Sequence, residues 1–158
     1  MNKLLLTILL ALVSTSAIAK GYLELKDVDV YSEDETKQMK ECDINNAEAI
    51  ASVQSALRYN RISIAENSDE SKVHFHISIT AANVSSDFCA AIVSLSVSTY
   101  GYVANSLLTH KGFQSEIRLC SQGILLTHKN SGIQAEINDT LRTATDICIS
   151  KVQSIKTN

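Results

Sequence analysis

Two stretches in the middle of the chain alternate apolar and polar residues, which is the pattern of half-buried β-strands. They read KVHFHISIT over residues 72–80 and AIVSLSVST over residues 91–99. Because successive side chains of a strand point to opposite faces, each stretch has one apolar and one polar face. The polar positions are His74, His76, Ser78, Thr80, Ser94, Ser96 and Ser98. The pattern predicts two neighbouring antiparallel strands with an exposed polar face.

Two further stretches repeat apolar residues every three or four positions, as amphipathic helices do. We expect the first helix between Asn45 and Asn60 and the second between Ser131 and Ser154. Each begins with a pair of residues at the spacing of a capping box, which satisfies free amide groups at a helix start. These pairs are Asn45 with Glu48, and Ser131 with Gln134.

The remaining segments have weaker patterns. Residues 22–31 alternate with a change of phase, which is typical of a short strand with a bulge or of two extended pieces. Residues 32–41 are acidic and polar, so we expect a solvated connection there. Glycine and small polar residues within 101–106 predict a turn. The chain from 107 to 129 then predicts one long broken strand or two short ones.

The expected elements run in the order strand, helix, several strands, helix. Runs of one element type, in place of strict alternation, are typical of the α+β class. We therefore predict an antiparallel sheet of about four or five strands with two amphipathic helices packed on one face, a two-layer sandwich.

The beginning of the chain has the three parts of a secretory signal peptide. Lys3 supplies the positive charge, residues 4–13 form an apolar run, and Ala17-Ile18-Ala19 supplies the small residues of a cleavage site. The run is shorter than the ~20 residues that a membrane-spanning helix needs. We expect residues 1–19 to be a cleaved signal peptide, and the mature protein to be periplasmic or secreted.

Cleavage after Ala19 leaves residues 20–43 as an extended segment and acidic connection, followed by a single α+β domain over residues 44–158. The complete chain has a formal charge of −3 at pH 7 and no basic patch. Nucleic acid is therefore excluded as a class of partner. No later apolar stretch is long enough to cross a membrane, so we expect no transmembrane segment in the mature chain.

The expected mature chain contains four cysteines: Cys42, Cys89, Cys120 and Cys148. An even number in an exported chain is typical of disulfides, whereas zinc sites favour closely spaced pairs. A hairpin that turns near Ala104-Asn105 would place Cys89 opposite Cys120. Two helices side by side would bring Cys42 near Cys148. We therefore expect the pairs 42–148 and 89–120, although sequence alone does not determine the connectivity.

The pentapeptide LLTHK occurs at residues 107–111 and again at residues 125–129. The flanking residues do not match, so we attribute the repeat to similar strand chemistry. Its histidines raise an alternative, because imidazoles on one sheet face can bind a divalent metal. The ligands of that site would be His74, His76, His110 and His128. A lysine follows each histidine of the repeat and disfavours a nearby cation, so we expect no cofactor.

The chain contains none of the common catalytic motifs, such as G-x-S-x-G, H-E-x-x-H or a phosphate-binding loop. We therefore expect a protein of the bacterial cell envelope that is not an enzyme and acts by binding. Its polar sheet face, or a free sheet edge, would bind an unidentified envelope or secreted protein, or a glycan. The alternative is a small periplasmic protein that binds a divalent metal through the strand histidines.

Overall fold

The computed structural model describes residues 21–22, 25–103 and 113–157. The main sheet has the strand order β2-β3-β4-β5, with β2 at Asp29–Ser32, β3 at Val73–Ser85, β4 at Phe88–Val103 and β5 at Phe113–Lys129. The helices are α1 at Lys37–Glu41, α2 at Asn46–Tyr59 and α3 at Asn130–Gln153, with a 3-10 turn η1 at Ser68–Glu70. The short strands β1 (Gly21–Tyr22) and β6 (Lys156–Thr157) form a separate antiparallel pair.

The main sheet is mixed, so the expected antiparallel sheet with two helices is wrong in detail and only the α+β class is confirmed. Strand β2 runs parallel to β3, whereas β3, β4 and β5 are successive antiparallel neighbours. A parallel pair requires a crossover connection, and here α1 and α2 lie between the two strands in the chain. Alternation of side chains reveals a strand but not its direction.

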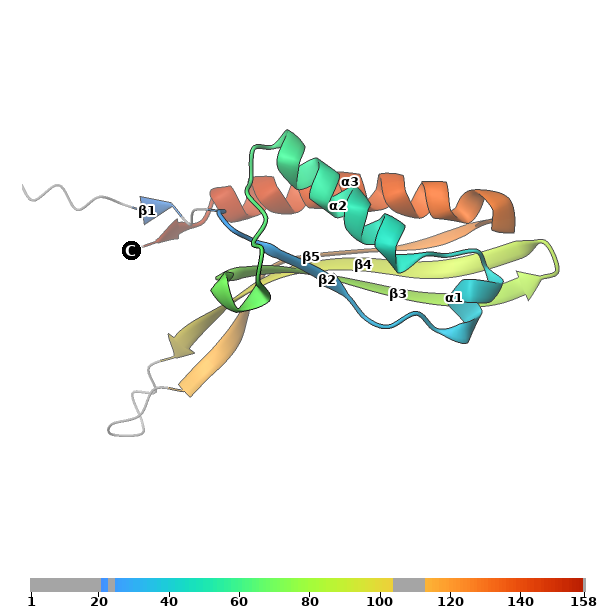
Figure 1. Ribbon diagram of the computed structural model, residues 1–158, viewed down its shortest axis with the longest axis horizontal. Helices are drawn as coiled ribbons and strands as arrows, with labels where there is room; N and C mark the ends of the chain where they lie inside the picture. The colour runs from blue at the N-terminus through green and yellow to red at the C-terminus, as the bar shows by residue number, and fades with distance from the viewer. Residues whose placement is uncertain (1–20, 23–24, 104–112, 158) are drawn as a thin grey trace, which may run out of the picture.

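Helices α2 and α3 lie on the same side of the main sheet, while the short α1 lies at the end of the sheet beside β3 (Figure 1). The core between the two layers is formed by alternate residues of β3 and β4 and by the apolar stripes of the helices. Fully buried members include Phe75, Ile77, Leu95, Leu57 and Ile137. Because α2 and α3 both pack on one side of the sheet, the opposite face is available as a binding surface.

The first predicted helix begins and ends where expected. The Asn45 side-chain oxygen accepts hydrogen bonds from the main-chain amides of Ala47 and Glu48, at 2.8 and 3.3 Å. The amide of Asn45 itself donates to the side-chain oxygen of Gln134 at 2.8 Å, so α3 supplies the acceptor that a capping box would take from Glu48. The N-terminal end of α2 is therefore hydrogen-bonded to α3.

The second predicted capping box is wrong. Helix α3 begins at Asn130, before Ser131, and its N-cap Lys129 makes no side-chain cap hydrogen bond. Gln134 is available to Asn45 because it does not bond back within its own helix start. The predicted end of the helix is confirmed, with Ser154 as the C-cap.

The segment at residues 20–43 contributes to the same folded unit. It supplies β2 to the sheet and α1 to the connection that was expected to be irregular. The Thr36 hydroxyl caps α1 by accepting from the Met39 amide at 3.2 Å, and the Met39 side chain is buried. A helix this short has only one buried residue, so no apolar period was visible in the sequence.

Strand β4 continues through the expected turn at Gly101 to Val103. Strand β5 is one long strand, and its pairing with β4 shifts register between Val97 and Ser98. The first LLTHK copy, including His110, lies outside the described residues, and so does the expected signal peptide at 1–19.

All four cysteines form disulfides, but the expected pairing is wrong. The bonds join Cys42 to Cys89 and Cys120 to Cys148. Cys89 is opposite His128 in the β4–β5 pairing, so Cys120 lies eight positions (128 − 120) further along β5, about 26 Å away. The hairpin is centred later in the chain than Ala104-Asn105. Cys120 instead faces α3, and Cys89 lies near the end of α1.

Candidate functional site

The seven polar strand residues predicted as a binding face lie on the side of the sheet that the helices leave uncovered. The register places His74 opposite Ser98, His76 opposite Ser96, and Ser78 opposite Ser94. Thr80 is exposed and the two histidines are half-buried. Ser98 is only 2% exposed, so it supports the face from beneath and does not reach a partner.

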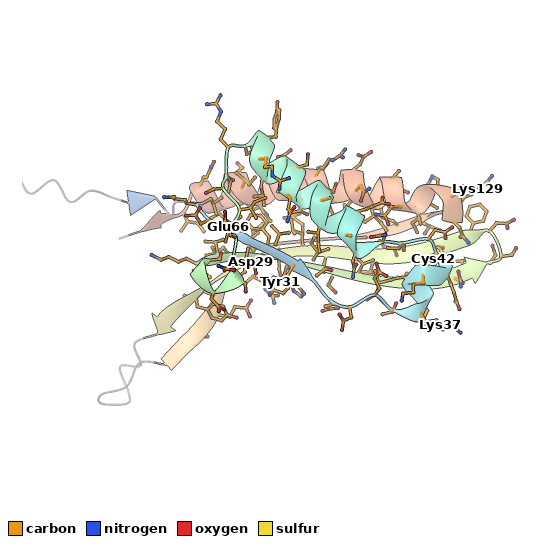
Figure 2. The ribbon with its side chains drawn as sticks, viewed as in Figure 1. Asp29, Tyr31, Lys37, Cys42, Glu66 and Lys129 are labelled. Carbon is orange, nitrogen blue, oxygen red and sulfur yellow. A yellow bond between two sulfur atoms is a disulfide. The ribbon has the colours of Figure 1, made fainter. Side chains whose placement is uncertain are left out.

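Strand β2 adds an aromatic residue to this face. Tyr31 is opposite His76 in the parallel pairing, and their rings stack with centroids 4.8 Å apart and planes 18° apart. Tyr31 alternates with the buried Val30, which directs its ring to the uncovered side, and Figure 2 marks it on β2 below the helix layer. One face of the ring is therefore occupied by His76, while its remaining surface is partly exposed.

Each histidine of the face contacts a carboxylate from the β2 segment. The Nδ1 atom of His74 lies 3.5 Å from Oδ2 of Asp29, and Nε2 of His76 lies 3.7 Å from Oε1 of Glu33. The Ser78 hydroxyl donates to the second oxygen of Glu33 at 3.2 Å. The two histidine–carboxylate separations are long for hydrogen bonds, so these are loose polar contacts that help to orient the imidazole rings.

The second tyrosine of the face is Tyr100, near the end of β4. Its ring meets that of His74 edge to face, with centroids 5.4 Å apart. Burial raises the pKa of Tyr31 above its usual value, and Tyr100, Glu116 and Asp29 raise it further. Tyr31 therefore remains a neutral phenol, a hydrogen-bond donor and acceptor, throughout the neutral pH range.

The other half of the uncovered face is apolar. Ile92 and Leu125 are directly opposite each other on β4 and β5, and they are 55% and 68% exposed. Thr80 is opposite Ile92 on its other side. An exposed cross-strand pair of large aliphatic side chains on the same sheet face as a polar aromatic cluster is the kind of surface that protein partners cover. We call the whole surface, from Tyr31 to Leu125, the open face.

The histidines do not converge on one ion. His74 is opposite Ser98 and His128 is opposite Cys89, so they are separated by nine positions (98 − 89) of β4, about 30 Å. Among the described residues, no group of three or more histidine, cysteine, aspartate or glutamate side chains could hold a metal ion. His128 is therefore removed from the alternative ligand set, and His110 lies outside the described part of the chain.

Sequence reasoning found the polar residues of β3 and β4 in the face but missed two further residues of β4 and all contributions of β5 and the β2 segment. The missed residues are Asp29, Tyr31, Glu33, Ile92, Tyr100 and Leu125. Because odd and even residues of a strand point to opposite faces, the sequence could have placed Tyr31 on the face away from the apolar Val28 and Val30. Its position next to His76 depends on a parallel pairing that the sequence pattern does not specify.

Comparisons with known proteins do not identify a family. No protein-family model matches the chain, and no curated protein matches it. The chain is similar to the crystal structure of the rare lipoprotein B from Shewanella oneidensis, with a TM-score of 0.34 and 11% identity over 78% of this chain and 90% of that chain. A similarity of this size gives no basis for transferring a fold or a function.

Two general properties of the chain bear on its location. Both disulfides are of the kind that persists in oxidising, extracytoplasmic compartments. Within residues 21–22, 25–103 and 113–157, no helix is long and apolar enough to cross a membrane.

Proposed function

We propose that this protein is a non-catalytic binding protein of the periplasm or the secreted fraction, and that it holds a protein partner against the open face. The single observation that carries the proposal is the exposed pair Ile92 and Leu125, which lies on the same face as the Tyr31–His76 stack, four positions (80 − 76) further along β3. Removing such apolar area from water favours association by roughly 25 cal/mol per Å² before ordering costs.

A protein partner fits the open face better than a glycan does. Sugar rings usually need an aromatic ring with a free face, and one face of Tyr31 is already occupied by His76. Ile92 and Leu125 have no polar groups to match the hydroxyls of a glycan. A protein surface can cover the aliphatic pair while its polar groups pair with the histidines and their carboxylates.

The same contacts support a non-catalytic role. Asp29 and Glu33 are each engaged with a histidine, and the raised pKa of Tyr31 keeps its phenol neutral and weakly nucleophilic. The face is also broad and open, so it would not exclude water from a reaction.

The proposal is tested by isolating native complexes of a tagged protein from its host and comparing two variants. The double variant Ile92→Thr, Leu125→Thr places β-branched threonine, a good strand former, at both positions but removes most of the exposed aliphatic surface. The control is Tyr59→Ser, which removes an exposed aromatic residue from the end of α2, on the helix side.

The expected result is one stoichiometric partner protein with the wild type and with Tyr59→Ser, and its loss with the double variant. Circular dichroism and thermal unfolding establish that all three proteins are folded. Retention of the partner by the double variant, or co-purification of a glycan in place of a protein, would contradict the proposal.

A further inference from the structure

A groove of about 530 Å³ lies on the helix side of the sheet, between α3 and β5. Its floor is apolar and buried, and is formed by Val93, Leu95 and Leu141. Ile124 and Ile147 line its walls and remain substantially exposed. The groove is on the opposite side of the sheet from the open face, so it is a separate site.

An acidic residue of α3 in this groove lacks a partner. The Oε2 atom of Glu136 is buried and has no hydrogen-bond partner among the described residues. A buried carboxylate oxygen without a donor is energetically costly. The neighbouring Asp139 also lines the groove, and its carboxylate is held by Arg142 at 3.3 Å. The Glu136 side chain as a whole lines the groove and is only partly buried, so its carboxylate fits a ligand that brings its own cationic donor.

The strand beside the groove has an unpaired edge. Strand β5 is the last in the sheet order and pairs with β4 alone among the described strands. Between Arg118 and His128 its sequence is LCSQGILLT, with no charged residue to block edge pairing. Main-chain donors and acceptors along this edge are free to receive an added strand.

We propose that an extended basic-apolar segment of a partner protein adds to β5 and fills this groove. Its main chain pairs with the free edge, an apolar side chain covers Ile124 and Ile147, and a lysine or arginine side chain pairs with the carboxylate of Glu136. A second copy of this chain fits less well, because its own LCSQGILLT stretch has no basic side chain to offer.

The test is selection of octapeptides from a displayed random library on the immobilised mature protein, followed by affinity measurements on the best synthetic peptide. Three variants accompany the wild type. Glu136→Gln removes the charge while keeping the shape, and Ile124→Ser removes apolar surface from the groove wall. Glu66→Gln is the control, because it removes an exposed acidic charge outside the groove.

We expect enrichment of peptides that alternate apolar residues with lysine or arginine on the wild type and on Glu66→Gln. The selected peptide should bind Glu136→Gln at least about tenfold more weakly, as expected for loss of one charge-assisted hydrogen bond. Ile124→Ser should also weaken it. Two further peptides carry methyl groups on alternate main-chain nitrogens, one at the odd and one at the even positions. The peptide whose methylated nitrogens face β5 should no longer bind.

Four outcomes would overturn the inference. They are absence of this enrichment, equal affinity for Glu136→Gln and Glu66→Gln, binding that survives both methylation phases, and self-association of the protein through β5. Survival of both methylated forms would mean that the groove takes a cationic side chain or amine without strand addition. Because the open face is unaltered in every variant, these results are independent of the proposed function.

Discussion

The environment of Tyr31 links β2 to the rest of the open face. Its ring stacks on His76, and its phenol lies within the electrostatic influence of Tyr100, Glu116 and Asp29. Burial, together with Tyr100, Glu116 and Asp29, raises the pKa of Tyr31 and disfavours the phenolate. The residue is therefore part of the fixed surface presented to a partner, and its ionisation should disturb that surface.

The raised pKa of Tyr31 makes a prediction about alkaline stability. A group with a raised folded-state pKa contributes stability that is present below the unfolded pKa, about 10, and is lost as pH rises through the folded value. The free energy of unfolding should therefore fall between about pH 9 and pH 11, and Tyr31→Phe should reduce that fall. Urea titrations at several pH values measure it. An identical pH dependence in both proteins would contradict the assignment.

Asn45 makes a second prediction at this scale. Its side chain caps α2 through two amides, so Asn45→Ala should lower the free energy of unfolding by about 1 kcal/mol. Asn67 is the matched control, because it precedes η1 without a side-chain cap hydrogen bond. Asn67→Ala should change stability by less than about 0.5 kcal/mol. Equal losses of unfolding free energy for the two variants, measured by urea unfolding, would contradict a specific stabilising effect of the Asn45 cap.

At the scale of elements, α3 and β5 form the unit that carries the groove, and β5 also supplies Leu125 to the open face. The bond between Cys120 and Cys148 joins the inner side of β5 to the buried stripe of α3. It holds the helix against an edge strand that is otherwise paired on one side only. The groove between the two elements should therefore lose its shape when this bond is removed.

The double variant Cys120→Ala, Cys148→Ala should be destabilised by roughly 2–4 kcal/mol, the usual effect of removing a native disulfide. Urea unfolding under non-reducing conditions measures the loss. Proteolytic peptides of the wild type, mapped without reductant at acidic pH, should contain Cys42 linked to Cys89 and Cys120 linked to Cys148. Peptides linking Cys42 to Cys148 would contradict the arrangement of these elements.

The elements differ in how far the sequence predicts them. Helix α2 and strands β3 and β4 were predictable because each buries one face and exposes the other, which leaves a period in the sequence. Helix α1 was not, because Met39 is its only buried residue. Strand β2 showed alternation at Val28 and Val30, but its parallel partner is separated from it by two helices. Pairing between distant segments has no local signal.

At the scale of the whole molecule, the register of the long β4–β5 hairpin determines the disulfide pairing and the separation of the histidines, which sequence reasoning did not predict. The pairing of Val103 with Phe113 at one end of the hairpin and of Phe88 with Lys129 at the other places Cys89 opposite His128. This register separates Cys89 from Cys120 and His128 from His74. The expected disulfide pairing and the alternative metal site with four histidines both depended on a different register. The face built from His74, His76 and the serines depends only on strand parity, and it was predictable.

The whole-molecule arrangement also separates two surfaces. Helices α2 and α3 lie on one side of the sheet (Figure 1), together with the groove and the disulfides. The opposite side carries the Tyr31–His76 stack and the Ile92–Leu125 pair. A partner on the open face would leave the β5 edge accessible. The two surfaces could therefore be occupied at the same time.

The most direct test of the open face is photo-crosslinking in the host with p-benzoylphenylalanine at one of two exposed positions. Leu125 lies on the open face, and Tyr59 lies at the end of α2 on the helix side. We predict one discrete, protease-sensitive adduct from position 125 and none from position 59. No adduct from position 125, the same adduct from both positions, or an adduct that resists protease would contradict a protein partner on the open face.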